Sequence, residues 1–334
     1  MTRQTVLVLG ATGGIGGEVA RQMLDAGWTV RGMRRASHAA NTANAANAAN
    51  ARRDGIEWIQ GDAMRREDVL RAARGAAVIV HAVNPPGYRN WADLVVPMID
   101  NTIAAAQAEG ATIVLPGTVY NFGPDAFPLL EEDSPQHPVT KKGAIRVELE
   151  SRLQRASETG TQAVIVRAGD FFGPNAGNSW FSQGFVKPGQ PVRKISNPSA
   201  RGAGHQWAYL PDVARTMVEL VARRDTLGAF ARFHMGGHWD EDGRQLAAAI
   251  QRAVERRAGR TPAIAAFPWW VLPLAAPFNT TLRELGEMRY LWRTPVRMSN
   301  ARLVDTLGRE PHTPLDEAVE TTLAGLGCLP AARV

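Results

Sequence analysis

The chain has 334 residues, of which 45% are hydrophobic and 21% charged, a balance typical of a globular protein with a sizeable core. Its single cysteine excludes an internal disulfide and predicts a reducing, cytoplasmic location. The net charge of +6 is carried by scattered arginine pairs without an aromatic stripe, so we expect attraction of an anionic small molecule and no nucleic-acid partner.

Apolar strand-like runs alternate with amphipathic helical patterns through the first half of the sequence. The strands are predicted at Thr5–Leu9, Thr29–Met33, Ile56–Gln60, Ala77–Ala82, Thr112–Pro116 and Gln162–Arg167, and the helices at Gly17–Ala26, Arg66–Arg74, Trp91–Glu109 and Ile145–Glu158. Glycines that follow these helices are typical stop signals: Gly27, Gly75, Gly110 and Gly160. The alternation predicts an α/β fold, a doubly wound parallel sheet with helices on both faces.

Three glycines follow the first predicted strand, at Gly10, Gly13 and Gly16, and a helix comes directly after them. Gly10 would permit a tight turn, Gly13 would let a pyrophosphate approach the backbone, and Gly16 would let the helix pack on the strand. The N–H groups of the segment Thr12, Gly13, Gly14 and Ile15 would then hold the phosphates. The motif therefore predicts a Rossmann-type dinucleotide site.

The end of the second predicted strand selects the dinucleotide. In such domains an acidic residue there holds a ribose 2′-hydroxyl and selects NAD, whereas arginine accommodates a 2′-phosphate. Here Arg34 and Arg35 stand at that position, so we expect NADP(H) to be preferred and keep NAD(H) as the alternative, with both arginines simply solvated. Asp62, after the third strand, is expected either to accept from the adenine amino group or to cap the next helix.

The alternation breaks after Arg167. Glycine- and proline-rich loops are followed by helices near Pro211–Arg224 and Glu241–Gly259, and a last helix is predicted with Thr313 as N-cap and Pro314 at its first position. We expect a Rossmann domain over residues 1–170 and mostly a smaller substrate lobe over 171–334, with 208–235 returning to the first domain.

Two segments are unusual in composition. The Ala/Asn-rich stretch Ala36–Ala51 is expected to be a tolerated surface insertion. The apolar stretch Phe267–Phe278 is too short and too rich in proline to span a bilayer. We expect it to be core or a lid over an apolar substrate pocket, and contact with a membrane surface or a partner is the alternative.

Further segments extend the pattern along the chain: Gly61-Asp62, His81–Asn84, Asn101-Thr102, Val119-Tyr120, Arg167–Pro174 and Trp207–Ala214. Taken with the glycine motif, they resemble the extended, epimerase/dehydratase-like branch of the short-chain dehydrogenase/reductase superfamily. The resemblance covers most of the chain. It implies a nicotinamide dinucleotide as cofactor, a small-molecule substrate and cofactor-binding roles for Ala63, Ala82, Val83, Asn84, Asn101, Arg146 and Asp170, the last where the family usually has Asn.

The chain departs from this family at all three catalytic positions. Aligning the family's Tyr-Gly-x-Ser-Lys-x-x-x-Glu stretch puts Lys142 at the tyrosine, Arg146 at the lysine and Glu150 at the glutamate, while Pro116 stands at the serine. Lys142 is interpreted as an acid or base, as an anchor for cofactor or substrate, or as a solvated surface lysine. Thr118 and Tyr120 could instead form a relocated pair.

The remaining candidates for chemistry are few. His81, His137 and His205 are isolated in the sequence and are expected to be structural, and no residue spacing is typical of a metal site. The sequence favours an NADP(H)-dependent oxidoreductase acting on a small or medium apolar carbonyl, with a non-standard proton donor. The alternatives are a non-catalytic NADP(H) sensor and a sugar-type epimerase or dehydratase. The resemblance also implies a homodimer through the two helices Trp91–Glu109 and Ile145–Glu158.

Overall fold

The computed structural model describes residues 3–35, 55–85, 91–176, 179–200, 202–270 and 286–330. The stretch Ala36–Ala51 and the part of Phe267–Phe278 beyond Trp270 lie outside these residues. The chain divides into two compact units. Unit 1 comprises Met1–Asn121, Lys141–Arg167 and Val213–Phe233, and unit 2 comprises Phe122–Thr140, Ala168–Asp212 and His234–Val334.

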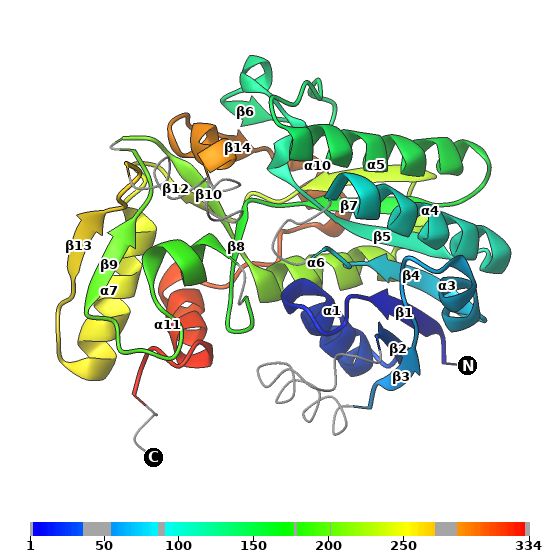
Figure 1. The fold of residues 1–334 in the computed structure, drawn as a ribbon, viewed down its shortest axis with the longest axis horizontal. Coiled ribbons are helices and arrows are strands. Elements are labelled where there is room, and N and C mark those ends of the chain that lie inside the picture. Colours follow the sequence, from blue (N-terminus) through cyan, green and yellow to red (C-terminus); the bar gives the residue numbers. More distant parts are fainter. Residues whose placement is uncertain are drawn as a thin grey trace. The chain divides into compact units, whose positions relative to one another are not determined.

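Unit 1 is built on a seven-stranded sheet (Figure 1). From edge to edge its strands are β11 (Phe230–His234), β7 (Ala163–Arg167), β5 (Thr112–Gly117), β4 (Ala76–His81), β1 (Thr5–Leu9), β2 (Thr29–Arg34) and β3 (Glu57–Gln60). The pairs from β7 through to β3 are parallel. The order places β1 in the middle, with β2 and β3 on one side and β4, β5 and β7 on the other, so the fold is the doubly wound one that the sequence predicts.

Helices flank this sheet. They are α1 (Gly14–Asp25), α3 (Arg66–Ala73), α4 (Trp91–Glu109), α5 (Lys141–Glu158) and the greater part of α6 (Leu210–Ala222), with 3-10 turns η3 (Val119–Asn121) and η6 (Arg224–Thr226). Alternate strand residues such as Leu7, Ile79 and Ile113 pack against α3, α4 and α5 in one core cluster, because successive side chains of a strand point to opposite faces. The glycines predicted to stop helices all have positive φ: Gly27, Gly75, Gly110 and Gly160.

Unit 2 contains three small sheets, β12-β10-β8, β13-β9 and β14-β6. Their strands are β6 (Leu129–Leu130), β8 (Asp170–Phe172), β9 (Lys194–Asn197), β10 (His205–Tyr209), β12 (His238–Asp240), β13 (Ala263–Ala266) and β14 (Arg297–Met298). The helical elements are η4 (Pro124–Ala126), η5 (Phe181–Phe185), α7 (Gln245–Ala258), η7 (Met288–Trp292), α10 (Ala301–Leu307) and α11 (Leu315–Gly325). Aromatic side chains from β8, β10 and η7 pack with the apolar faces of α7 and α11 in a second core cluster.

Several helix boundaries differ from the sequence predictions. The helix α5 begins at Lys141, four positions before the predicted Ile145, so Lys142 lies in its first turn. The predicted last helix is present as α11, but its predicted cap is wrong, because α11 begins at Leu315 with Pro314 in the N-cap position. Thr313 caps nothing, because its N–H and its hydroxyl both donate to the carboxylate of Asp212, at 2.6 and 2.8 Å. A hydrogen-bond partner that is distant in the sequence, Asp212, has thus replaced the local N-cap interaction predicted for Thr313.

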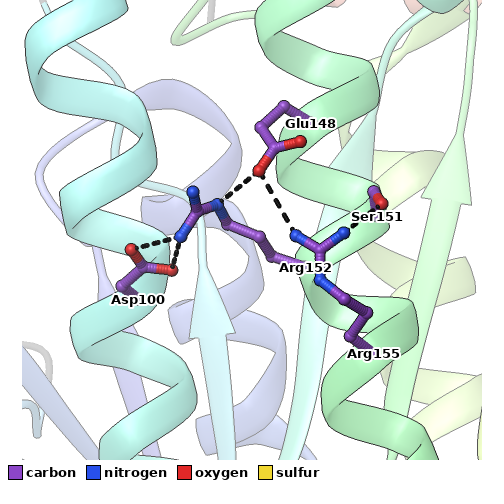
Figure 2. Close-up of polar contacts among 5 residues, drawn as sticks. All are labelled: Asp100, Glu148, Ser151, Arg152 and Arg155. Carbon is purple, nitrogen blue, oxygen red and sulfur yellow. Dashed lines mark hydrogen bonds and ion pairs between the residues drawn. The ribbon is translucent and has the colours of Figure 1, made fainter.

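The outer surfaces of α4 and α5 carry a connected set of charges (Figure 2). Arg152 of α5 donates to both oxygens of Asp100 on α4, at 2.9 and 2.7 Å, and to Glu148 at 2.8 Å. Glu148 also accepts from Arg155 at 3.3 Å. A cavity of about 270 Å³ lies on the same surface, with Asp100, Arg152 and Arg155 among its lining residues. The two helices are thus joined by ion pairs at their exposed side.

Candidate functional site

The glycine loop between β1 and α1 is shaped by close backbone contacts. Gly10 has φ of +88°, and a Cβ there would lie 2.5 Å from the carbonyl oxygen of Ala82, the residue after β4. A Cβ on Gly16 would lie 2.3 Å from the carbonyl oxygen of Gly10. Both distances are far below van der Waals contact, so any side chain would push the loop or the helix away from its strand. Gly10 and Gly16 therefore have the turn and packing roles that the motif predicts.

Gly13 is different because little protein surrounds it. A Cβ there would meet only the carbonyl oxygen of Gly10, at 3.3 Å. Gly13 is exposed and takes the N-cap position of α1, where it offers no side-chain cap, and no acidic residue stands in the first turn. The first N–H groups of a helix have no intrahelical partner, so the segment Thr12 to Ile15 presents donors and a positive helix end to a phosphate. The residues present fit a dinucleotide.

At the end of β2, Arg34 is half-buried and its guanidinium lies over the ring of Trp58 on β3, 5.0 Å from the ring centroid. A cation held over an indole face is attracted by about 0.5–1 kcal/mol or more. Trp58 therefore restrains Arg34 at the strand end. Arg35, the next residue, is exposed. The alternative in which both arginines are freely solvated does not hold for Arg34.

The loop after β3 is tied to two helices. The side-chain amide of Asn101 on α4 donates to the carbonyl of Ala63 at 2.8 Å. The backbone N–H of Asp62 donates to Asp68 on α3 at 3.0 Å, and this bond and that from Arg71 hold the pKa of Asp68 below its usual value. The Asp62 carboxylate accepts from the N–H of Met64 at 3.0 Å. The prediction that Asp62 caps the next helix is wrong, because α3 has its N-cap at Arg65.

His81, the last residue of β4, is buried and neutral. Its Nδ1 lies 2.8 Å from the hydroxyl of Thr102, which itself donates to the Met98 carbonyl at 3.0 Å. A hydroxyl has one proton to donate, so Nδ1 of His81 carries the proton and donates to Thr102. Burial, with a smaller contribution from the charge of Arg146, lowers the pKa of His81 to about 3. The side chain therefore holds β4 to α4 and exchanges no proton near neutral pH.

The residues after β4 meet the helix α5. The N–H of Ala82 donates to Leu9 at 2.9 Å and continues the sheet, Val83 packs on the core, and Asn84 is exposed. Arg146 reaches the side-chain oxygen of Asn84 at 3.5 Å, and its guanidinium lies over the ring of Trp91, 5.0 Å from the centroid. At the family's lysine position the chain thus holds a charge that cannot be deprotonated.

The other two altered positions are also resolved in unit 1. Lys142 is 3% exposed, so the interpretation of a solvated surface lysine is wrong. Pro116, in place of the serine, lies within β5 and offers no hydroxyl. Glu150 instead keeps the family's residue and forms a buried ion pair with Arg167 at 2.7 Å, their side chains being 4% and 1% exposed. Arg167 also donates to the carbonyl of Thr118, which fixes the end of β5 to β7 and α5.

Thr118 and Tyr120 follow β5 directly. The hydroxyl of Thr118 donates to the side-chain oxygen of Asn121 at 3.2 Å. Tyr120 lies in the 3-10 turn η3 and is half-buried. The structure therefore brings both residues to the carboxyl end of the sheet, where doubly wound folds bind ligands, with the threonine hydroxyl engaged in the turn.

Asp170 belongs to unit 2, at the start of β8. Its carboxylate lies 2.8 Å from Nε2 of His205, and the two side chains are 14% and 8% exposed. The family resemblance implies a cofactor-binding role for Asp170 and does not connect it with His205. His137 also pairs with a carboxylate, that of Asp125 at 2.7 Å, but on the surface, with 73% of its side chain exposed.

Sequence reasoning missed three contacts in unit 1 and one in unit 2. It did not single out Trp58 and Trp91. It named Glu150, Arg167, Asp170 and His205 but paired neither Glu150 with Arg167 nor Asp170 with His205, because each contact joins two different elements. The sequence contained a signal for Trp58, because this residue lies on the predicted strand next to the one that ends at Arg34. In the structure Trp58 lies opposite Gly32 in the parallel pairing of β2 and β3.

Over the residues that the structure describes, no group of three or more histidine, cysteine or acidic side chains is placed to hold a metal ion. Within the same residues no helix is long and apolar enough to cross a membrane.

Comparison with known proteins extends this picture. A sequence profile of the NAD dependent epimerase/dehydratase family matches residues 6–236. No curated protein matches the chain. Among solved structures, UDP-glucose 4-epimerase from Thermotoga maritima with UDP-glucose aligns with a TM-score of 0.72 at 14% identity, over 96% of this chain and 98% of the other. UDP-glucose 4-epimerase from Brucella ovis in complex with NAD gives 0.69 at 15%, over 97% and 98%.

The Bordetella bronchiseptica enzyme WbmH in complex with NAD+ aligns with a TM-score of 0.67 at 18% identity, over 97% of this chain and 98% of the other. At such identities the structural likeness shows the fold, and the profile match, which covers more than half of the sequence, shows the family. The chain belongs to the NAD dependent epimerase/dehydratase family.

Proposed function

We propose that this protein is an NADP(H)-dependent oxidoreductase that acts on a small or medium apolar carbonyl compound or the corresponding alcohol. The observation that carries the proposal is the open helix end at Gly13 together with Arg34 at the end of β2. The first supports binding of a pyrophosphate, and the second supports binding of a further phosphate on the adenosine ribose.

The choice of NADP(H) rests on charge. Two solved relatives of the fold contain NAD, and NAD selection requires an acceptor for the ribose 2′-hydroxyl at the end of the second strand. In this chain that position holds a cation restrained by Trp58. A guanidinium donates and does not accept, and it pairs with a phosphate dianion. Arg35 beside it adds positive charge on the surface.

The bound dinucleotide would supply or accept a hydride, which is the chemistry that nicotinamide brings to such sites. Around it the chain's own residues have distinct tasks. The glycine loop holds the phosphates, Asn101 orders the loop at Ala63, and Arg146 offers a permanent charge beside Asn84. Lys142, buried at the family's tyrosine position, would anchor the substrate or cofactor. The proton donor is therefore non-standard, because Pro116 offers no hydroxyl and position 142 carries no phenol.

A nucleotide-sugar epimerase is the second candidate, because two of the aligned structures are UDP-glucose 4-epimerases. Both candidates share hydride transfer at a carbon that bears oxygen. They differ in whether the reduced or oxidised product leaves the protein. The buried single cysteine, Cys328, supports a reducing, cytoplasmic setting.

The cofactor proposal is tested by titrating the protein with NADPH and with NADH, using energy transfer from its nine tryptophans. We expect NADPH to bind more tightly, and Arg34→Ala to weaken NADPH about 10- to 100-fold with little effect on NADH, because a lost charge-assisted contact is worth about 1.5–3 kcal/mol. Arg31→Ala is the matched control, since it removes one positive charge from the same strand at a residue already paired with Glu57. Equal binding of both dinucleotides, unchanged by Arg34→Ala, would contradict the proposal.

Turnover then separates the candidates. An oxidoreductase consumes NADPH in the presence of an apolar ketone or quinone. An epimerase converts UDP-glucose into its 4-epimer without net consumption of dinucleotide, which proton NMR of the sugar detects. A protein that binds NADPH tightly and does neither with any of these probes would be a sensor, the non-catalytic alternative.

A further inference from the structure

Trp58 lies on β3, the edge strand of the unit 1 sheet (Figure 1), and shares a face of that sheet with Arg34. In the parallel pairing of β2 and β3, Gly32 lies opposite Trp58. Directly paired residues of neighbouring strands point the same way, and so do residues two apart in one strand. Met33 and Ile59, which point the other way, pack in the core cluster with α3 and α4. Trp58 and Arg34 are thus diagonal neighbours on the opposite face.

Gly32 provides the space in which the indole ring of Trp58 lies. Gly32 is buried, and a Cβ there would lie 2.8 Å from Cζ3 and 3.1 Å from Cε3 of Trp58. The same Cβ would lie 3.2 Å from the Cβ of Ala11 in the glycine loop. The ring and the loop therefore flank the same point of β2. Any side chain at position 32 would push the ring of Trp58 away from the strand.

The guanidinium of Arg34 lies over this seated ring, with Cζ 5.0 Å from the ring centroid. Both side chains are half-buried. A long side chain that is free in solution samples many rotamers, and a ligand that fixes it in one loses binding free energy to that ordering. Because the indole face already attracts the guanidinium in the free protein, less of this ordering remains for the ligand to impose. Arg34 is therefore pre-organised by Trp58.

Unit 1 contains a second pair of the same chemistry at the other end of β2. The guanidinium of Arg224 lies 5.4 Å from the ring centroid of Trp28, the residue before β2 begins at Thr29. The strands β1 and β2 are parallel, and the glycine loop follows the end of β1. The pair formed by Trp28 thus lies at the edge of the sheet remote from the loop, whereas the pair formed by Trp58 lies at the edge where doubly wound folds bind dinucleotides.

We propose that Trp58 is a positioning residue that sets the preference for NADP(H), because it holds Arg34 in place to bind the 2′-phosphate of the adenosine ribose; this inference rests on the proposed function. The indole acts through the guanidinium and does not itself bind the phosphate. NADH lacks that phosphate, so the contribution of Trp58 belongs to NADPH binding alone. An indole that stacked on the adenine ring would instead support both dinucleotides alike.

The test measures the affinities of NADPH and NADH by isothermal titration calorimetry, which does not depend on tryptophan fluorescence. We expect Trp58→Leu to weaken NADPH about 3- to 20-fold, which matches the attraction between a cation and an indole face. The affinity for NADH should change by less than about twofold, because no contact to it passes through Arg34. Trp58→Phe should bind NADPH at least about twofold more tightly than Trp58→Leu, since a phenyl face also attracts a guanidinium.

Trp28→Leu is the matched control, because it removes a half-buried indole from under an arginine of the same unit, at the other end of β2. It should leave both affinities within about twofold of wild type. A double-mutant cycle shows whether Trp58 acts through Arg34. In the Arg34→Ala background, Trp58→Leu should change the NADPH affinity by less than about twofold, because the contact that it would remove is already gone.

The outcomes are separable. If wild type binds both dinucleotides equally, the NADP(H) preference of the proposed function fails, and the inference fails with it. If Arg34→Ala removes the preference and Trp58→Leu keeps it, the inference alone is overturned. Equal weakening of NADPH and NADH by Trp58→Leu, additive losses in the double variant, or a preference that persists in Arg34→Ala also overturn it. If Trp58→Leu does not fold, Trp58→Met, which fills more of the space without an aromatic face, carries the same test.

Discussion

Gly10, Gly13 and Gly16 each lack a side chain for a different physical reason. Gly10 has a left-handed backbone and touches the end of β4, Gly16 touches the turn itself, and Gly13 faces open space at the start of α1. The fold alone accounts for the first two, and the open space at Gly13 leaves room for a ligand. A protein that had lost its cofactor could keep Gly10 and Gly16 for packing, so Gly13 is the residue that best supports a functioning phosphate site.

The charged residues near the site likewise differ in whether the fold alone accounts for them. Arg146 and Lys142 replace a lysine and a tyrosine, and neither can reproduce the phenol that the family uses. Glu150, at a position that keeps the family's residue, neutralises the buried Arg167. Removing one partner of such a pair leaves a buried charge, which costs about 3–5 kcal/mol. The ion pair therefore holds the end of β7 to α5.

His81 should make the free energy of unfolding depend on pH. Its pKa is about 3 in the folded protein and about 6.5 when unfolded. The unfolded chain thus binds a proton first as pH falls, so the contribution is complete above pH 6.5 and is lost progressively between there and pH 3. From pH 7 to pH 5 we expect a loss of about 2 kcal/mol from this residue. Urea unfolding at the two values measures it.

The matched variant is His81→Gln, which cannot titrate but retains a side-chain amide to donate to Thr102. Its loss of stability between pH 7 and pH 5 should be smaller than that of wild type by the same amount. An identical pH dependence in both proteins would mean that His81 is not held neutral by burial.

At the scale of elements, carboxylates hold backbone segments of unit 2 in place. Glu310 reaches across more than 70 positions of sequence and accepts from the N–H groups of Gly236 and Gly237, both at 2.7 Å, and it also accepts from Asn300 at 2.8 Å. Asp240 acts locally and accepts from Gln245 and Leu246 at the start of α7. These carboxylates accept hydrogen bonds from backbone N–H groups that have no strand or helix partner. Hydrogen bonds to a charged acceptor are stronger than those between neutral groups.

Glu310→Gln tests this element-level role. An amide has one oxygen where the carboxylate has two, so one of the two glycine N–H groups loses its acceptor. We expect the free energy of unfolding to fall by about 1–3 kcal/mol, measured by chemical denaturation. Glu241→Gln, at an exposed position of the same unit, should change it by less than about 0.5 kcal/mol. Equal stability of Glu310→Gln and wild type would contradict the assignment.

At the scale of the whole molecule, two units are built from an interleaved chain. The helix α6 begins in unit 2 and ends in unit 1, and β11 passes from unit 1 to unit 2. The predicted division at residue 170 and the return of 208–235 remain proposals about domains. Each unit has its own apolar cluster, which supports separate cores.

The homodimer through α4 and α5 also remains a prediction. On these helices Arg152 joins Asp100 and Glu148 beside the cavity (Figure 2). We expect wild type to sediment as a dimer and Arg152→Glu, which places three acidic groups together, to shift it toward the monomer. Arg252→Glu breaks a similar pair with Asp316 between α7 and α11 and should leave the mass unchanged. A wild-type monomer at all concentrations would rule out the dimer.

The sequence alone predicted the alternation of β1 to β5 and β7 with α1, α3, α4 and α5 in unit 1, but not the edge strand β11. The strands are short, nearly continuous apolar runs, as expected for a parallel sheet covered on both faces. The helices show a wider apolar period and end at glycines, and each of these signals lies within about ten residues. The glycine motif also lies within a few consecutive residues, and so does the end of β2, which carries arginine where NAD-selective domains carry an acidic residue. For this reason the fold class and the family could be predicted before any contact was known, and a dinucleotide site could be proposed.

The partners of individual side chains were decided only by the tertiary structure. His205 meets Asp170 across 35 positions of sequence and Glu150 meets Arg167 across 17, and no local window contains either pair. Thr313 does not form the predicted N-cap, because its N–H and its hydroxyl both donate to the carboxylate of Asp212. The sequence could not decide whether Lys142 is exposed or buried, because its burial depends on which elements surround the first turn of α5. A charged or polar group takes its role from the groups that compensate it, and folding alone brings those groups together.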